Sequence, residues 1–376
     1  MPNTFDDKIR GMLLLGAYGD ALGAAQEGQE TPTPDPLPTR LVARDMPEWG
    51  EAWGTWLPAI VHAKRIGMPT DDTCYRLCVL HPWLAAIADD DRTFDEASLR
   101  DFMAALRHEP LYPEWYSFAC RDHLTAWLDM FQAHQENRSE GLFSPGVPGV
   151  FGLFLYLEMA AVRHGTTPLE TFTVYQRQAS LDQGYAKAVT GFVATLVSLA
   201  VNEAAETSSF GDWFFDRGRA VLDDLAAATQ TQEAASLRGV LEAMAQLGRE
   251  LRGETESTLN TVFKQRVLDP PMPPFLDHAF LGGLHDPYRV LAQLTATIAY
   301  APDDPATALR AIAHSCGNTA TLASLLGSLL GAWYGAEQLS TLHTEGLDFQ
   351  AELDIVETNL TELFHFDLGQ HGLHSS

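Results

Sequence analysis

Cysteine, basic residues and long apolar runs are all scarce in this sequence, and each shortage excludes a class of protein. The chain has 4 cysteines in 376 residues, too few and too scattered for a disulfide framework, which indicates a reducing compartment. It has 24 Lys and Arg against 50 Asp and Glu, for a formal net charge of −26. Because no basic cluster is present to neutralise phosphates, we expect no nucleic-acid partner. A basic protein or a metal ion is the more compatible partner.

Neither a signal peptide nor a membrane span is indicated. The N-terminal residues are acidic, and the apolar run from Ile9 is interrupted by glycines and by Asp20. The longest apolar stretches, residues 192–201 and 322–334, either fall short of about 18 apolar residues or carry Ser and Gly. We therefore expect a cytoplasmic protein without a membrane partner. Its content of 46% hydrophobic and 20% charged residues predicts a folded core.

Helical spacing dominates the rest of the sequence and predicts an all-α fold. Apolar residues recur three and four positions apart, whereas no comparable series of alternating strands is present. The predicted helices cover residues 9–22, 73–87, 98–106, 117–133, 149–164, 184–201, 210–227, 234–251, 287–300, 305–314 and 321–339. Pro-rich stretches such as residues 31–38 connect them. Because composition stays even and no repeat is present, we predict a single domain over residues 1–376.

The first and last of these helices are rich in glycine. The glycines are Gly16, Gly19 and Gly23 in the first, and Gly327, Gly331 and Gly335 in the last. Glycine costs about 1 kcal/mol relative to alanine inside a helix, so its recurrence indicates backbones that approach closely. We predict that these two helices pack against each other.

A hydroxyl and two carboxylates stand together in Thr70-Asp71-Asp72-Thr73. Three hard oxygen ligands suit Mg²⁺, which keeps several waters when bound to protein. The same residues also suit the start of a helix, with Thr70 as N-cap and both aspartates in the first turn. Taken alone, the motif favours the helix cap over the metal site.

Three stretches of the sequence, one of which includes this motif, favour the metal site instead. They are residues 9–24 with the nearby Glu27, residues 67–73, and residues 316–335. Together, in this order and spacing, they resemble the ADP-ribosylglycohydrolase family across most of the chain. The resemblance implies one orthogonally packed all-α domain with a central cleft that holds two Mg²⁺ ions. Family members hydrolyse the glycosidic bond between ADP-ribose and a protein side chain or a related acceptor.

The resemblance also implies roles for individual residues. Thr70, Asp71 and Asp72 stand where the family places its first metal ligands, and Glu27 stands where many members have a glutamate facing the substrate. We therefore assign catalytic roles to Glu27, Asp71 and Asp72, and metal ligation to Thr70, Asp71 and Asp72.

The last motif of the family departs from its pattern here. The family sequence usually reads Gly-Gly-Asp-Thr-Asp-Thr, and this chain has Asn318 and Ala320 at the two aspartate positions. Asn318 and Thr321 remain as candidate metal ligands, whereas Ala320 offers no side-chain oxygen. Because bridging carboxylates are needed to hold two cations close together, we expect at most one Mg²⁺ ion.

The middle motif is also altered. Where the family has a Gly-Asn-Gly loop ending in Met-Arg, residues 141–148 lack both the Asn and the Arg. We nevertheless assign ligand contacts to residues that the family motifs place near the substrate. These are Asp20, Gly141, Ser144, Gly146 and Gly317.

Three functions fit these observations. The first is a degenerate enzyme that binds an ADP-ribosyl-like ligand or a protein partner without efficient turnover, which the loss of several site groups favours. The second is a divergent hydrolase that removes ADP-ribose from a modified protein with one or no metal. The third is an immunity-type protein whose acidic surface neutralises an ADP-ribosylating toxin.

Overall fold

Every regular element in the described part of the computed structural model is a helix, which confirms the predicted all-α fold. None of the described helices is long and apolar enough to cross a membrane. The structure describes residues 4–35, 37, 72–73, 76–77, 80, 151–162, 167–178, 184–203, 209–229, 232–269, 287–340, 342, 347, 353–354 and 356–362. The predicted helices at residues 98–106 and 117–133 lie outside these ranges.

Helix α1 (Phe5–Gly23) begins with a side-chain cap. The hydroxyl of Thr4 accepts a hydrogen bond from the amide of Asp7 at 3.1 Å. Two acidic residues in the first turn interact favourably with the positive end of the helix dipole. Nearly all of its remaining length is buried, including both the apolar residues and the glycines. This burial places α1 inside the protein rather than on its surface.

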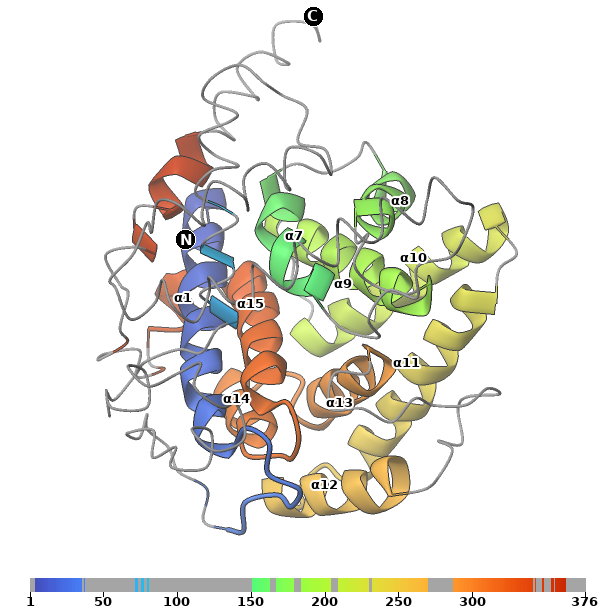
Figure 1. The fold of residues 1–376 in the computed structure, drawn as a ribbon, viewed down its shortest axis with the longest axis vertical. Helices are drawn as coiled ribbons and strands as arrows, with labels where there is room; N and C mark the ends of the chain where they lie inside the picture. The colour runs from blue at the N-terminus through green and yellow to red at the C-terminus, as the bar shows by residue number, and fades with distance from the viewer. Residues whose placement is uncertain are drawn as a thin grey trace, which may run out of the picture.

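Helix α15 (Thr319–Gln338) lies alongside α1 and runs in the opposite direction (Figure 1). The two backbones approach so closely that side chains are excluded. A Cβ at Gly19 would lie 2.0 Å from the carbonyl oxygen of Ala323, and one at Gly327 would lie 2.0 Å from that of Leu15. Such contacts are well below van der Waals distance, so only glycine fits. The predicted packing of the two glycine-rich helices is confirmed.

Most of the other helices lie on the α15 side of this pair (Figure 1). The other helices are α7 (Phe151–Val162), α8 (Pro168–Gln178), α9 (Gly184–Asn202), α10 (Phe210–Thr229), α11 (Gln232–Glu250), α12 (Glu256–Phe263), α13 (Pro287–Tyr300) and α14 (Pro305–Ala313). A 3₁₀ turn (Ala24–Gln26) follows α1, and a π-helical turn (Lys264–Leu268) follows α12. Residues 356–362 are also helical. The sequence analysis missed α8 and α12, because α12 is short and α8 carries few apolar residues.

A buried lysine joins α1 to the end of α9. Lys8 is 2% exposed, and its Nζ donates hydrogen bonds to the carbonyl oxygens of Ala200 and Glu203. The ammonium group also lies 5.8 Å from the ring centroid of Trp333. A cation is favourable at a helix C-terminus, where carbonyl groups lack partners within the helix. Burial nevertheless lowers the pKa of Lys8 from 10.5 to about 8, against an opposing effect of the Glu203 carboxylate.

We predict that Gly19→Ala destabilises the fold, because the new methyl group would overlap the backbone of α15. Overpacking of this kind costs about 1–3 kcal/mol, and more where only backbone can move. Urea denaturation measures the free energy of unfolding. Gly218→Ala is the matched control, since a Cβ there would meet only side-chain atoms, at 3.2 and 3.3 Å. Equal stability changes in the two variants would contradict the close approach of α1 and α15.

A second prediction concerns Lys8 and pH. Since its pKa is about 8 in the folded protein and 10.5 in the reference state, the unfolded chain binds more protons between these values. The free energy of unfolding therefore gains a contribution that rises with pH from about 8 to 10.5. In Lys8→Met this contribution is absent. Urea denaturation of both proteins at pH 7 to 10 tests the prediction, and a stability difference that stays constant with pH would refute it.

Candidate functional site

The N-terminal turn of α15 is held by the segment that follows α1. Two backbone hydrogen bonds link Gly317 to this segment, one from Gly28 N to Gly317 O and one from Gly317 N to Gln29 O, each 2.9 Å long. Thr33 N donates to His314 O at 3.0 Å. Gly317 has φ 91°, a left-handed conformation that favours glycine. Main-chain contacts thus fix the loop that carries residues 314–318.

Glu27 lies at the positive end of α15. Its Oε2 accepts hydrogen bonds from the amide of Ala320 at 2.7 Å and from the hydroxyl of Thr319 at 3.3 Å. A carboxylate here satisfies an amide that has no partner within the helix and interacts favourably with the helix dipole. The predicted catalytic glutamate therefore serves as a cap for α15 in this structure.

Three side-chain oxygens converge at the same first turn of α15. The Oγ1 of Thr321 lies 2.9 Å from Oδ2 of Asp72 and 2.8 Å from Oδ1 of Asn318. All three residues are buried. The hydroxyl has one proton and donates to one of these acceptors at a time. Carboxylate, amide and hydroxyl oxygens together are the donor set of a hard cation such as Mg²⁺.

The same donor set does not suit two cations. Ala320 is 2% exposed and contributes only a methyl group, while the amide of this residue is bonded to Glu27. Across the described ranges, no three His, Cys, Asp or Glu side chains form a group that would hold a metal ion. One hard cation with several waters fits Asp72, Asn318 and Thr321, and a bridging carboxylate for a second is not found among the described residues.

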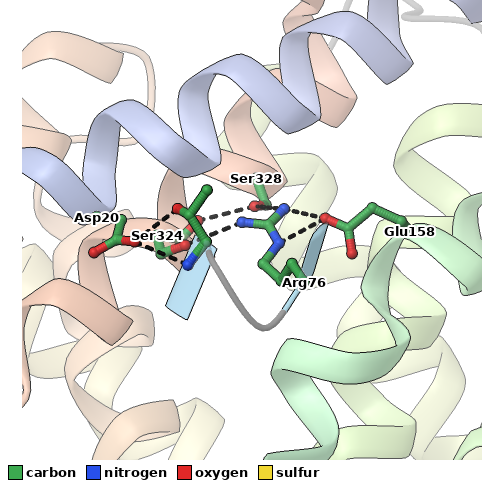
Figure 2. Close-up of polar contacts among 6 residues, drawn as sticks. Asp20, Arg76, Glu158, Ser324 and Ser328 are labelled. Carbon is green, nitrogen blue, oxygen red and sulfur yellow. Dashed lines mark hydrogen bonds and ion pairs between the residues drawn. The ribbon is translucent and has the colours of Figure 1, made fainter. Parts of the chain in front are cut away.

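Asp20 on α1 supports the segment that carries Asp72. Its Oδ2 accepts hydrogen bonds from the amide of Thr73 at 2.9 Å and from the hydroxyl of Thr73 at 2.6 Å, and the carboxylate is fully buried. Figure 2 shows this contact beside a second polar group built around Arg76. Asp20, predicted as a ligand contact, thus holds the neighbour of Asp72.

The sequence analysis missed Arg76 and Glu158, which form a buried ion pair across 82 positions in the chain (Figure 2). The sequence carries a weak indication of each residue. Glu158 is the one charged residue of the otherwise apolar α7, and Arg76 follows Asp72 by four positions, on the same face of a helix. Ser324 and Ser328, which accept hydrogen bonds from Arg76, are also four positions apart on α15.

The predicted site residues separate into two sets. Asp20, Glu27, Asp72, Asn318 and Thr321 lie together with Gly317 around the C-terminal half of α1 and the start of α15. Five others lie outside the described residues. These are Thr70, Asp71, Gly141, Ser144 and Gly146.

Comparison with known proteins gives matches over nearly the whole chain. The sequence model of the family described as ADP-ribosylglycohydrolase matches residues 1–367. A solved structure described as an ADP-ribosylglycohydrolase-related protein complex superposes with a TM-score of 0.60 at 18% identity, covering 96% of this chain and 99% of that chain. At this identity the likeness shows the fold alone. A search of curated proteins gives no match.

We predict that Glu27→Ala destabilises the start of α15. The buried amide of Ala320 loses the carboxylate that accepts its hydrogen bond, at a cost of about 1–3 kcal/mol. Glu27→Gln keeps an acceptor oxygen and should lose less. Glu30→Ala is the control, because it removes an equal charge from an exposed position in the same segment. Urea denaturation compares the three, and a Glu27→Ala protein no less stable than Glu30→Ala would contradict the capping role.

Proposed function

The chain belongs to the ADP-ribosylglycohydrolase family, and on that basis we propose that it binds an ADP-ribosyl-like ligand at a site whose metal centre is impaired. The ligand lies near the start of α15, where Glu27, Asp72, Asn318 and Thr321 come together. Turnover is strongly reduced relative to a family member with two metal ions. The whole chain, residues 1–376, acts as one such domain.

The observation that carries this proposal is the set of side chains at the start of α15. Asn318 and Ala320 are neutral where the family pattern has aspartates. Two divalent cations about 4 Å apart repel by roughly 16 kcal/mol at an effective dielectric constant of 20. Carboxylates between the ions normally offset this repulsion. With one alanine methyl and one amide at these positions, the described residues supply too little negative charge to hold both ions.

A single Mg²⁺ remains compatible with the oxygens of Asp72, Asn318 and Thr321. When bound, such an ion acts as a Lewis acid and lowers the pKa of a bound water. The chain's own residues orient this donor set without it. Asp20 holds Thr73, Thr321 bridges Asp72 and Asn318, and Glu27 accepts a hydrogen bond from the amide of Ala320. These contacts support ligand binding with a fixed geometry even at low metal occupancy.

A divergent hydrolase that works with one ion is the alternative. It is favoured by the presence of Asp72, Thr321 and Glu27 in one place, since a carboxylate near a bound water can assist proton transfer. The two proposals differ in turnover rather than in binding, so an activity assay separates them.

We predict fewer than two tightly bound divalent ions per chain. Elemental analysis of protein purified without chelator measures the occupancy, calorimetry with ADP-ribose measures ligand binding, and release of ADP-ribose from arginine- and serine-modified proteins measures turnover. We expect binding of ADP-ribose with little or no release. Two ordered ions, or rapid release that Asp72→Ala abolishes, would mean that the metal centre is intact and the impaired-site proposal wrong. Absence of ADP-ribose binding would exclude the proposed ligand.

The double variant Asn318→Asp with Ala320→Asp tests whether the missing carboxylates are the reason that the metal centre is impaired. Each substitution returns an anionic oxygen, so affinity for Mg²⁺ or Mn²⁺ should increase at least tenfold, measured by calorimetry. Ala226→Asp with Ala227→Asp adds the same charge at exposed positions of α10 and is the matched control. An equal gain in both variants would show a general charge effect and contradict the assignment.

A further inference from the structure

The guanidinium group of Arg76 makes four hydrogen bonds to side chains beside the candidate site. The group is 4% exposed and donates to oxygens on two helices (Figure 2). On α7, Nε lies 2.7 Å from Oε1 of Glu158, and Nη2 bonds to the same oxygen. On α15, Nη1 lies 3.0 Å from the hydroxyl of Ser324 and Nη2 lies 2.9 Å from that of Ser328.

A third helix shapes the space for this group. Gly16 of α1 faces the guanidinium, and a Cβ there would lie 2.4 Å from Nη1 of Arg76 and 2.5 Å from the hydroxyl of Ser328. The glycine therefore leaves room for the charged group at the contact of α1 and α15. One side chain thus touches three helices that come from the start, middle and end of the chain.

These contacts also fix the register of Asp72 and Arg76 along α15. Asp72 meets Thr321, and four residues later Arg76 meets Ser324 and Ser328, so the segment carrying them runs in the same direction as α15. The three hydroxyl residues lie on one face of α15. A slip of one helical turn, about 5.4 Å, would move Arg76 away from its oxygens and Asp72 away from Thr321 together.

Stability alone does not account for this ion pair. Taking both charges out of water has a large cost, and well-packed apolar residues in their place are often as stable. Buried polar groups are best documented as devices that select one register over another. Both Arg76 and Glu158 are buried, and Oε2 of Glu158 has no hydrogen-bond partner within the described part of the chain. Arg76 is thus the group that compensates the charge of Glu158.

We propose that Arg76 is a positioning residue, which holds the helical residues 72–73 and 76–77 in register on α15 and so places Asp72 against Thr321 and Asn318. Glu158 and the two serines are its anchors. The effect on cation and ligand affinity rests on the proposed function, whereas the effect on register does not.

The test is the double variant Arg76→Met with Glu158→Leu, which removes both charges and keeps apolar volume. Its melting temperature should stay within a few degrees of wild type, whereas Arg76→Met alone leaves Glu158 uncompensated and should melt much lower or fail to fold. Hydrogen exchange followed by mass spectrometry should show at least tenfold faster exchange in residues 72–80 of the double variant, with α9 and α13 unchanged. Its affinity for Mn²⁺ should fall at least tenfold. Arg76→Lys keeps the charge without the planar fork and should give an intermediate exchange rate.

Arg238→Met with Asp223→Leu is the control, because it removes an ion pair that joins α10 to α11 on the surface. Unchanged exchange in residues 72–80 of the Arg76–Glu158 double variant would overturn the proposal, and so would faster exchange throughout α9 and α13 or wild-type affinity for Mn²⁺. If the wild type binds no Mn²⁺, the cation part of the proposed function is wrong. The exchange comparison then still decides the role of Arg76.

Discussion

The contact between the backbones of α1 and α15 determines where the described site residues lie. Glycines on both helices remove the side chains that would separate them, so main-chain atoms of one helix touch those of the other along their length. Because the helices are antiparallel, the end of α1 meets the start of α15. Asp20 and the segment with Glu27 are thereby brought to Asn318 and Thr321, some 300 residues later in the chain.

Hydrogen bonds of the candidate site residues also stabilise the fold. Glu27 caps α15, Asp20 holds Thr73, and Thr321 joins Asp72 to Asn318. The bonds of Glu27 to Ala320, of Asp20 to Thr73 and of Thr321 to Asp72 link segments that are distant in sequence. The candidate site and the packing of its helices are therefore one arrangement, so a change at any of these side chains affects the stability of the fold.

The pairing of α1 and α15 could be predicted because glycine inside a helix is unfavourable unless it serves close packing. The convergence of Asp20, Glu27, Asp72 and Thr321 was predicted from the family resemblance. Their individual contacts were not, because the amide or hydroxyl that a carboxylate meets depends on the angle and offset between helices. Arg76 and Glu158 were missed for the same reason. A single charge in an apolar helix such as α7 indicates a buried partner but does not identify it.

Neutral side chains at positions 318 and 320 also limit the negative charge at this end of α15. Glu27 and Asp72 already bring two carboxylates to the start of the helix. At an effective dielectric constant of 20, each further carboxylate about 4 Å from one of these would add roughly 4 kcal/mol of repulsion in the absence of a cation. Asn318 instead accepts a hydrogen bond from Thr321, and Ala320 leaves its amide to Glu27. The helix dipole and these hydrogen bonds thus stabilise the two carboxylates that lie at this end of α15.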